Sequence, residues 1–127
     1  MRVLVCGGRD YDNKPRVYEV LDRIHAEHTI GLLICGDAKG ADALARRWCT
    51  KHGIPLAVFP PAWGKLRKTA GPIRNTWMLK FMKPHLVVAF PGGRGTQNML
   101  TQSEEAGAKI ERIDQNSNQE TQEEWWL

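Results

Sequence analysis

Three glycine-rich turns, each between a short apolar run and a helix-like segment, constrain the fold of this chain most. They read Cys6-Gly7-Gly8-Arg9-Asp10, Gly36-Asp37-Ala38-Lys39-Gly40-Ala41-Asp42 and Pro91-Gly92-Gly93-Arg94-Gly95-Thr96. A strand that runs through a tight turn into a helix is the repeating unit of a parallel sheet. Because the carboxyl ends of parallel strands lie at one edge, we expect the three turns to converge on one crevice.

The hydrophobic pattern extends this unit along the chain. Continuous apolar runs predict buried strands, whereas apolar residues three and four apart predict helices. The expected strands are residues 2–6, 30–35, 54–59, 86–90 and 109–113. The expected helices are residues 15–28, 41–52, 72–82 and 96–106. This order predicts an α/β fold with a five-stranded, mostly parallel sheet and helices on both faces.

Length and charge divide the chain into a body and a tail. Its 127 residues suit one folded domain, which we place at 1–113. Residues 114–127 form a polar segment that ends in Trp125-Trp126-Leu127, and we expect it to be flexible. The tail carries −4, so the body of this +4 chain carries +8. A basic body suits phosphates, on a small ligand or on nucleic acid.

Other sequence features limit the cellular setting. The three cysteines have no CxxC spacing and the four histidines have no metal-ligand spacing, so we assign no disulfide and no metal. An odd cysteine count without a secretory leader, and the lack of a long apolar run, predict a cytoplasmic protein that does not contact a membrane. Trp77 and Phe81 could belong to the core or to a subunit interface.

Each turn offers groups that suit a phosphate-bearing ligand. Glycines let the backbone approach a ligand closely, and the helix starts behind them favour anions. Thr96 could cap its helix and donate to a phosphate oxygen. The expected ligand-binding residues are Gly7, Gly8, Arg9, Gly36, Lys39, Gly40, Asp42, Arg74, Asn75, Gly92, Gly93, Arg94, Gly95 and Thr96.

Carboxylates and an aromatic residue leave alternatives open. Asp42 could cap its own helix or accept hydrogen bonds from ribose hydroxyls, and Asp37 or Asp42 could be catalytic. Trp63 could stack on a base or pack beneath its loop. The dinucleotide fingerprint G-x-G-x-x-G is absent, which disfavours an ordinary NAD-dependent dehydrogenase, and the third turn is not a Walker loop.

Taken in order, the motifs resemble the SLOG superfamily, and within it the YspA and YpsA-related branch. The resemblance is carried by Cys6-Gly7-Gly8-Arg9-Asp10, Gly36-x-x-Lys39-Gly40-Ala41-Asp42, Gly71-Pro72-x-Arg74-Asn75 and Pro91-Gly92-Gly93-Arg94-Gly95-Thr96. It implies a Rossmann-like fold and a nucleotide-derived ligand at the glycine turns. Because relatives tend to be dimers, it also implies that this chain could form a homodimer.

The superfamily includes lysine decarboxylase-like phosphoribohydrolases that activate cytokinins, single-strand-binding DNA-processing protein A, and sensors of ADP-ribose species. The phosphoribohydrolases read P-G-G-x-G-T-x-E-E, where the glutamate pair carries the chemistry. Asn98 and Met99 occupy those two positions here, and Glu104 and Glu105 lie at least two helical turns beyond Thr96. The resemblance therefore implies that the binding half of the site is kept and the hydrolytic half is missing.

Three functions follow as expectations. The first is binding of a nucleoside phosphate or an ADP-ribose or NAD-like ligand, as a sensor. The second is an N-glycosidic or phosphoester hydrolase that uses Asp37 or Asp42. The third is a single-stranded nucleic-acid binder that uses the basic body and Trp63.

Overall fold

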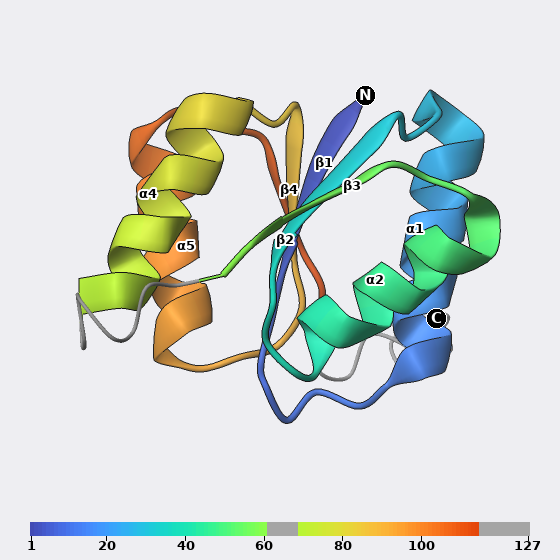
Figure 1. Ribbon diagram of the computed structural model, residues 1–127, viewed down its shortest axis with the longest axis horizontal. Coiled ribbons are helices and arrows are strands. Elements are labelled where there is room, and N and C mark those ends of the chain that lie inside the picture. The colour runs from blue at the N-terminus through green and yellow to red at the C-terminus, as the bar shows by residue number, and fades with distance from the viewer. Residues whose placement is uncertain (61–68, 115–127) are drawn as a thin grey trace, which may run out of the picture.

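A single parallel sheet organises the computed structural model, which describes residues 1–60 and 69–114. The strand order is β3-β2-β1-β4-β5, and every neighbouring pair is parallel (Figure 1). The strands are β1 (Arg2–Cys6), β2 (Leu32–Gly36), β3 (Leu56–Phe59), β4 (Leu86–Ala89) and β5 (Ile110–Arg112). The helices are α1 (Lys14–His28), α2 (Ala41–His52), α4 (Ala70–Met82) and α5 (Arg94–Glu105). The predicted α/β, Rossmann-like fold is confirmed.

Helices cover both faces of the sheet. Figure 1 shows α1 and α2 on one face and α4 and α5 on the other. Along β1, Val3 and Val5 enter the core beneath α1 and α2, while Leu4 enters the core beneath α4 and α5. Successive side chains of a strand point to opposite faces, so a strand buried on both faces needs an unbroken apolar run.

The helix boundaries follow local chemistry. The side chain of Asn13 caps α1 by accepting a hydrogen bond from the Arg16 N–H at 3.1 Å. Gly53 ends α2 in the left-handed conformation, at φ 67°. Two helices begin two residues earlier than expected: α4 begins at Ala70 and α5 begins at Arg94.

The order of strands fixes where a ligand site can form. From β1 the chain proceeds outward through β2 to β3, and then returns to the other side of β1 with β4 and β5. Open parallel sheets bind ligands at the carboxyl edge where the order reverses, here between β1 and β4. The three glycine turns leave β1, β2 and β4, which are neighbours, at the lower edge of the sheet in Figure 1.

Several expectations concern residues outside this description. Trp63 and the tail beyond Asp114 lie outside the described residues.

Trp77 and Phe81 do not belong to the core, since they are 38% and 63% exposed on α4. No helix in the described ranges is long and apolar enough to cross a membrane.

Candidate functional site

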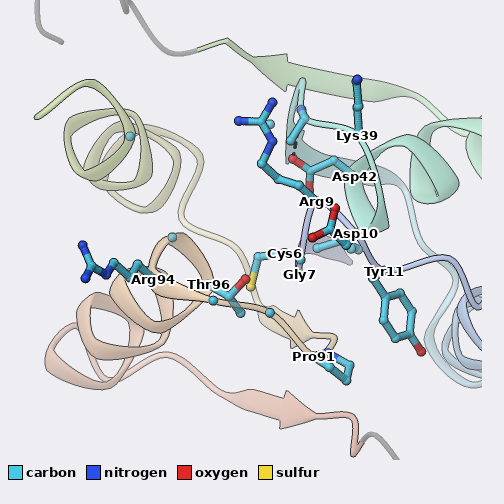
Figure 2. Close-up of a pocket in the computed structure, with 18 of the residues that line it drawn as sticks. Cys6, Gly7, Arg9, Asp10, Tyr11, Lys39, Asp42, Pro91, Arg94 and Thr96 are labelled. Atoms are coloured by element: carbon cyan, nitrogen blue, oxygen red, sulfur yellow. Dashed lines mark hydrogen bonds between the residues drawn. The ribbon is translucent and has the colours of Figure 1, made fainter. Parts of the chain in front are cut away.

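The three glycine turns surround one cavity of about 1000 Å³ at the carboxyl edge of the sheet (Figure 2). This volume is at the upper end of the range for small-molecule sites. The predicted site residues that line it are Gly7, Gly8, Arg9, Gly36, Asp37, Lys39, Asp42, Arg74, Asn75, Gly92, Gly93, Arg94, Gly95 and Thr96. Gly40 is not in its lining.

Gly8 joins the first turn to both of the others. Its N–H donates to the carbonyl of Pro91 at 2.8 Å, and its own carbonyl accepts from the N–H of Ala41 at 3.1 Å. The N–H of Tyr11 also donates to that carbonyl, at 3.2 Å. The N–H groups of Gly8 and Ala41 are therefore occupied within the protein.

Four glycines permit the close contact between the turns. A Cβ on Gly7 would lie 2.5 Å from the Cβ of Ala41, and one on Gly8 would lie 2.9 Å from the Pro91 carbonyl oxygen. A Cβ on Gly40, whose φ is +73°, would collide with the Gly8 carbonyl oxygen, and one on Gly92 with Thr96 Oγ1. We call Gly7, Gly8, Gly40 and Gly92 the junction glycines, because packing between turns requires them.

Gly93 and Gly95 have different surroundings, and we call them the rim glycines. A Cβ on either would meet no atom within 4 Å, although both residues line the cavity. They flank the start of α5, where the first N–H to bond inside the helix belongs to Gln97, which donates to the Gly93 carbonyl at 2.9 Å. Among the described residues, the N–H groups of Arg94, Gly95 and Thr96 have no acceptor. Such groups and the helix dipole favour an anion.

The prediction that Thr96 caps its helix is wrong. Gly93 occupies the N-cap position, with no side-chain capping bond, and Thr96 is the third residue of α5. Thr96 is 8% exposed, and its hydroxyl has no hydrogen-bond partner in the described ranges, so it can donate into the cavity.

Asp42 is a buried carboxylate at the cavity wall. It is 6% exposed, and its Oδ2 accepts from the N–H of Ala38 at 3.3 Å, whereas Gly40 holds the N-cap position of α2. Burial raises the pKa of Asp42 to about 6, against the opposing effects of Arg74, the Ala38 N–H and Arg46. This carboxyl therefore changes its charge near neutral pH.

Arg46 forms hydrogen bonds with the second turn, and Arg74 packs against it. Arg46, which the sequence analysis did not single out, donates from Nη1 to the carbonyls of Gly36 at 3.0 Å and Ala38 at 3.1 Å. Arg74 donates from Nη1 to the Phe59 carbonyl at 3.1 Å and lies against the bare Cα of Gly36. A side chain on Gly36 would displace that guanidinium.

Asn75 and Asn98 belong to a polar network between α4 and α5. Asn75 is 3% exposed and its Nδ2 donates to the Gly95 carbonyl at 3.3 Å and to Asn98 Oδ1 at 3.0 Å. Its Oδ1 accepts from Arg74 Nε at 3.0 Å. Gln102 Nε2 donates to Asn98 Oδ1 at 2.8 Å. This network fixes the start of α5 relative to α4, and it occupies both the oxygen and the NH₂ group of the Asn75 amide.

The helix that holds catalytic glutamates in the phosphoribohydrolases presents no carboxylate here. The cavity-lining residues of α5 are Arg94, Gly95 and Thr96. Asn98 is part of the polar network, and Met99 is fully buried in the core. Glu104 pairs instead with Arg112, near the other end of the helix. Among the described residues, the carboxylates that line this cavity are those of Asp10, Asp12, Asp37 and Asp42.

Charge around the cavity is mixed rather than uniformly basic. Four of its lining residues are basic and four are acidic, namely Arg9, Lys39, Arg74 and Arg94, and Asp10, Asp12, Asp37 and Asp42. Figure 2 shows Arg9 and Lys39 on the same side as Asp42, while Arg94 extends from the start of α5 on the other side. The site therefore offers donors for an anion together with acceptors for hydroxyl or amino groups.

Cys6 and Tyr11 are among the lining residues that the sequence analysis did not assign to the site. Burial raises the pKa of the Cys6 thiol to about 12, so it stays protonated. Tyr11 follows the first turn directly, and an aromatic side chain next to a glycine turn was the signal that could have found it. No three His, Cys, Asp or Glu side chains in residues 1–60 and 69–114 are grouped closely enough to hold a metal ion.

Comparisons with known proteins support the family resemblance over the part of the chain that contains the first two turns. A model described as the YspA, cpYpsA-related SLOG family matches residues 1–65, which is just over half of the chain and includes both of these turns. The chain is also similar to the Gene 61 protein of Mycobacterium phage D29. The two are 29% identical over 117 residues, which cover 86% of this chain and 93% of the phage protein.

Proposed function

The chain belongs to the YspA, cpYpsA-related SLOG family, and from this membership and its cavity we propose that it binds a nucleotide or a nucleotide-derived ligand. The ligand class is a nucleoside phosphate or an ADP-ribose-like molecule. One observation carries the proposal: three turns from adjacent strands line one cavity, and one wall of that cavity is a helix start with unpaired N–H groups. If such a ligand is detected, a sensor role is the function to test next.

The phosphate would lie against the start of α5. The three unpaired N–H groups and the Thr96 hydroxyl belong to residues that line this part of the cavity, and Arg94 adds positive charge. The rim glycines present no side chain, so a phosphate oxygen can reach the backbone. Backbone N–H groups at a helix start are a recurrent phosphate site in nucleotide-binding folds.

The ribose would be recognised by the second turn. An ionised Asp42 accepts hydrogen bonds, and charge-assisted bonds of this kind orient vicinal hydroxyls well. Asp37 supplies a second acceptor in the same turn, and Lys39 balances the local charge. We assign Asn75 a positioning role, because its amide is already bonded to Arg74, Gly95 and Asn98.

Hydrolysis of the nucleotide is a second candidate function, favoured by Asp42. Its pKa of about 6 suits proton transfer near neutral pH, which commonly accelerates a reaction by about 10²–10⁴-fold. Release of free base from AMP that is lost in Asp42→Asn would establish this function. Absence of turnover with AMP, NAD and ADP-ribose would leave binding alone.

Two measurements test the proposed binding. Native mass spectrometry of the purified protein would identify any nucleotide that copurifies, and isothermal titration with AMP and ADP-ribose would give affinity and stoichiometry. We expect one ligand per chain and a shallow salt dependence. A protein that binds single-stranded nucleic acid would instead lose affinity for an oligonucleotide steeply as the salt concentration rises, with a log–log slope of about −0.7 per phosphate contact. AMP would not displace that oligonucleotide. That outcome would replace the proposal with the nucleic-acid function.

A further inference from the structure

Tyr11 stands at one end of the cavity. In Figure 2 its ring lies beyond Gly7 and Pro91, on the opposite side of the picture from Arg94. It packs on Phe90, with ring centroids 5.4 Å apart and planes tilted by 34°. Phe90 is 1% exposed and belongs to the core beneath α1 and α2. The core therefore holds the half-buried Tyr11 ring in place while the ring also lines the cavity.

No other described residue that lines the cavity is aromatic. The hydroxyl of Tyr11 has no hydrogen-bond partner in the described ranges. Both the Arg16 guanidinium and the neighbouring Asp12 carboxylate interact electrostatically with that hydroxyl, and of these two groups only Asp12 lines the cavity. This end of the cavity thus combines a flat apolar ring with a carboxylate acceptor.

Tyr18, the other tyrosine of the chain, has different surroundings. The ammonium groups of Lys14 and Lys51 lie 5.2 and 5.6 Å from its ring centroid, as in cation–π contacts. Tyr18 does not line the cavity. The two side chains share their chemistry but only Tyr11 is available to a ligand, which makes Tyr18 a matched control.

We propose that the heteroaromatic base of the ligand stacks on Tyr11 and that Asp12 accepts a hydrogen bond from an exocyclic amino group of that base. This assignment rests on the proposed nucleotide site and gives the ligand a direction. The phosphate lies at α5 and the base at Tyr11, so the ribose lies between them, beside the first and second turns. The ligand class is an amino-bearing nucleotide such as an adenine nucleotide.

Isothermal titration with AMP and with ribose 5-phosphate tests the stacking. Tyr11→Leu keeps apolar volume against Phe90 and removes the aromatic face. We expect this variant to bind AMP at least about 10-fold more weakly, as for loss of a base–aromatic stack, and ribose 5-phosphate as the wild type does. Tyr18→Leu should change neither. Asp12→Ala, which removes the acceptor, should weaken AMP binding but not IMP binding, because IMP lacks the amino group.

The outcomes separate this assignment from the proposed function. Unchanged AMP affinity in Tyr11→Leu overturns the stacking and leaves the nucleotide site standing, and so does an equal loss of AMP and ribose 5-phosphate. Failure of the wild type to bind either ligand overturns the nucleotide site itself, and the stacking with it. If Tyr11→Leu does not fold, nuclear Overhauser contacts between adenine H2 or H8 and the Tyr11 ring of the wild type decide, and their absence overturns the stacking.

Discussion

The triplet Gly-Gly-Arg occurs in the first turn as Gly7-Gly8-Arg9 and in the third as Gly92-Gly93-Arg94, yet its second glycine has opposite surroundings in the two turns. A Cβ on Gly8 would lie 2.9 Å from the Pro91 carbonyl oxygen, whereas one on Gly93 would meet nothing within 4 Å. Gly8 also bonds to both other turns, through its N–H and its carbonyl. The same tripeptide sequence thus allows close packing between turns in the first turn and access to the cavity in the third.

This difference shows what a glycine-rich turn can and cannot mean. The junction glycines bring three backbones into contact, and this contact places the turns around one cavity. The rim glycines leave the start of α5 uncovered, and this exposure is what a phosphate requires. A variant at the junction should therefore act on stability, and a variant at the rim should act on ligand binding.

The largest effect is expected at the junction. Gly8→Val should lower the free energy of unfolding by about 4 kcal/mol, because the new side chain meets backbone that cannot move aside and breaks the bonds between turns. Urea unfolding followed by circular dichroism measures it. Gly93→Val is the matched control, with a loss below about 1 kcal/mol expected. Equal losses in the two variants would break the distinction between junction and rim.

The rim variant should act on binding. Gly93→Val places a branched side chain in front of the unpaired N–H groups of α5, and we expect AMP affinity to fall at least about 100-fold, or ~2.7 kcal/mol. Isothermal titration of the folded variant checks this. Gly31→Val, at the other edge of the sheet and with only ordinary contacts near 3.9 Å, should bind as the wild type does. If the folded Gly93→Val variant binds AMP with full affinity, the assignment of the phosphate site to the third turn is wrong.

How far the sequence could predict the site depends on this same distinction. Apolar runs such as 2–6 and the turns after them were enough to predict the parallel sheet and the convergence of the turns, because both follow from local pattern. Gly8 and Gly93 could not be told apart, since the difference depends on which turn lies opposite. The role of Asn75 was equally hidden, because its partners Gly95 and Asn98 come from another helix.

The burial of Asp42 and the resulting rise in its pKa could not be predicted from the sequence either. A carboxylate two residues into a helix reads as a cap, but burial beside Gly36 is a property of the assembled turns. Trp63 was the aromatic residue expected either to stack on a base or to pack beneath its loop, and it lies outside the described residues, whereas Tyr11 lines the cavity. Tyr11 was missed because a residue after a turn can point either into a site or into the core.

A smaller, pH-dependent effect is expected at Asp42, where junction and cavity meet. Its pKa is raised from 3.8 to about 6, so the folded state holds the proton more tightly, and stability present below pH 4 is lost as the pH rises through 6. Asp42→Asn has no such loss and should be more stable than the wild type by up to about 3 kcal/mol at pH 8, and nearly as stable as the wild type at pH 4. Urea unfolding at both values tests it.

Asp37→Asn is the control for Asp42, because Asp37 is exposed in the same turn. It should change stability by less than about 0.5 kcal/mol at either pH. A destabilised Asp42→Asn at pH 8 would mean that the ionised carboxylate holds the second turn, and Asp42 would then belong to the junction.

The smallest effect concerns the acidic tail. Residues 115–127 contain three glutamates and no lysine or arginine, while the body is basic. A tethered acidic segment competes weakly with a phosphate ligand, and salt screens that competition. Removing residues 115–127 should therefore tighten AMP binding by about threefold or less at 0.02 M salt, with no change at about 0.5 M. Glu120→Gln, Glu123→Gln and Glu124→Gln together keep both tryptophans and should reproduce the result. Tightening that persists at high salt, and only in the truncated chain, would instead identify Trp125 and Trp126 as the groups that cover the rim.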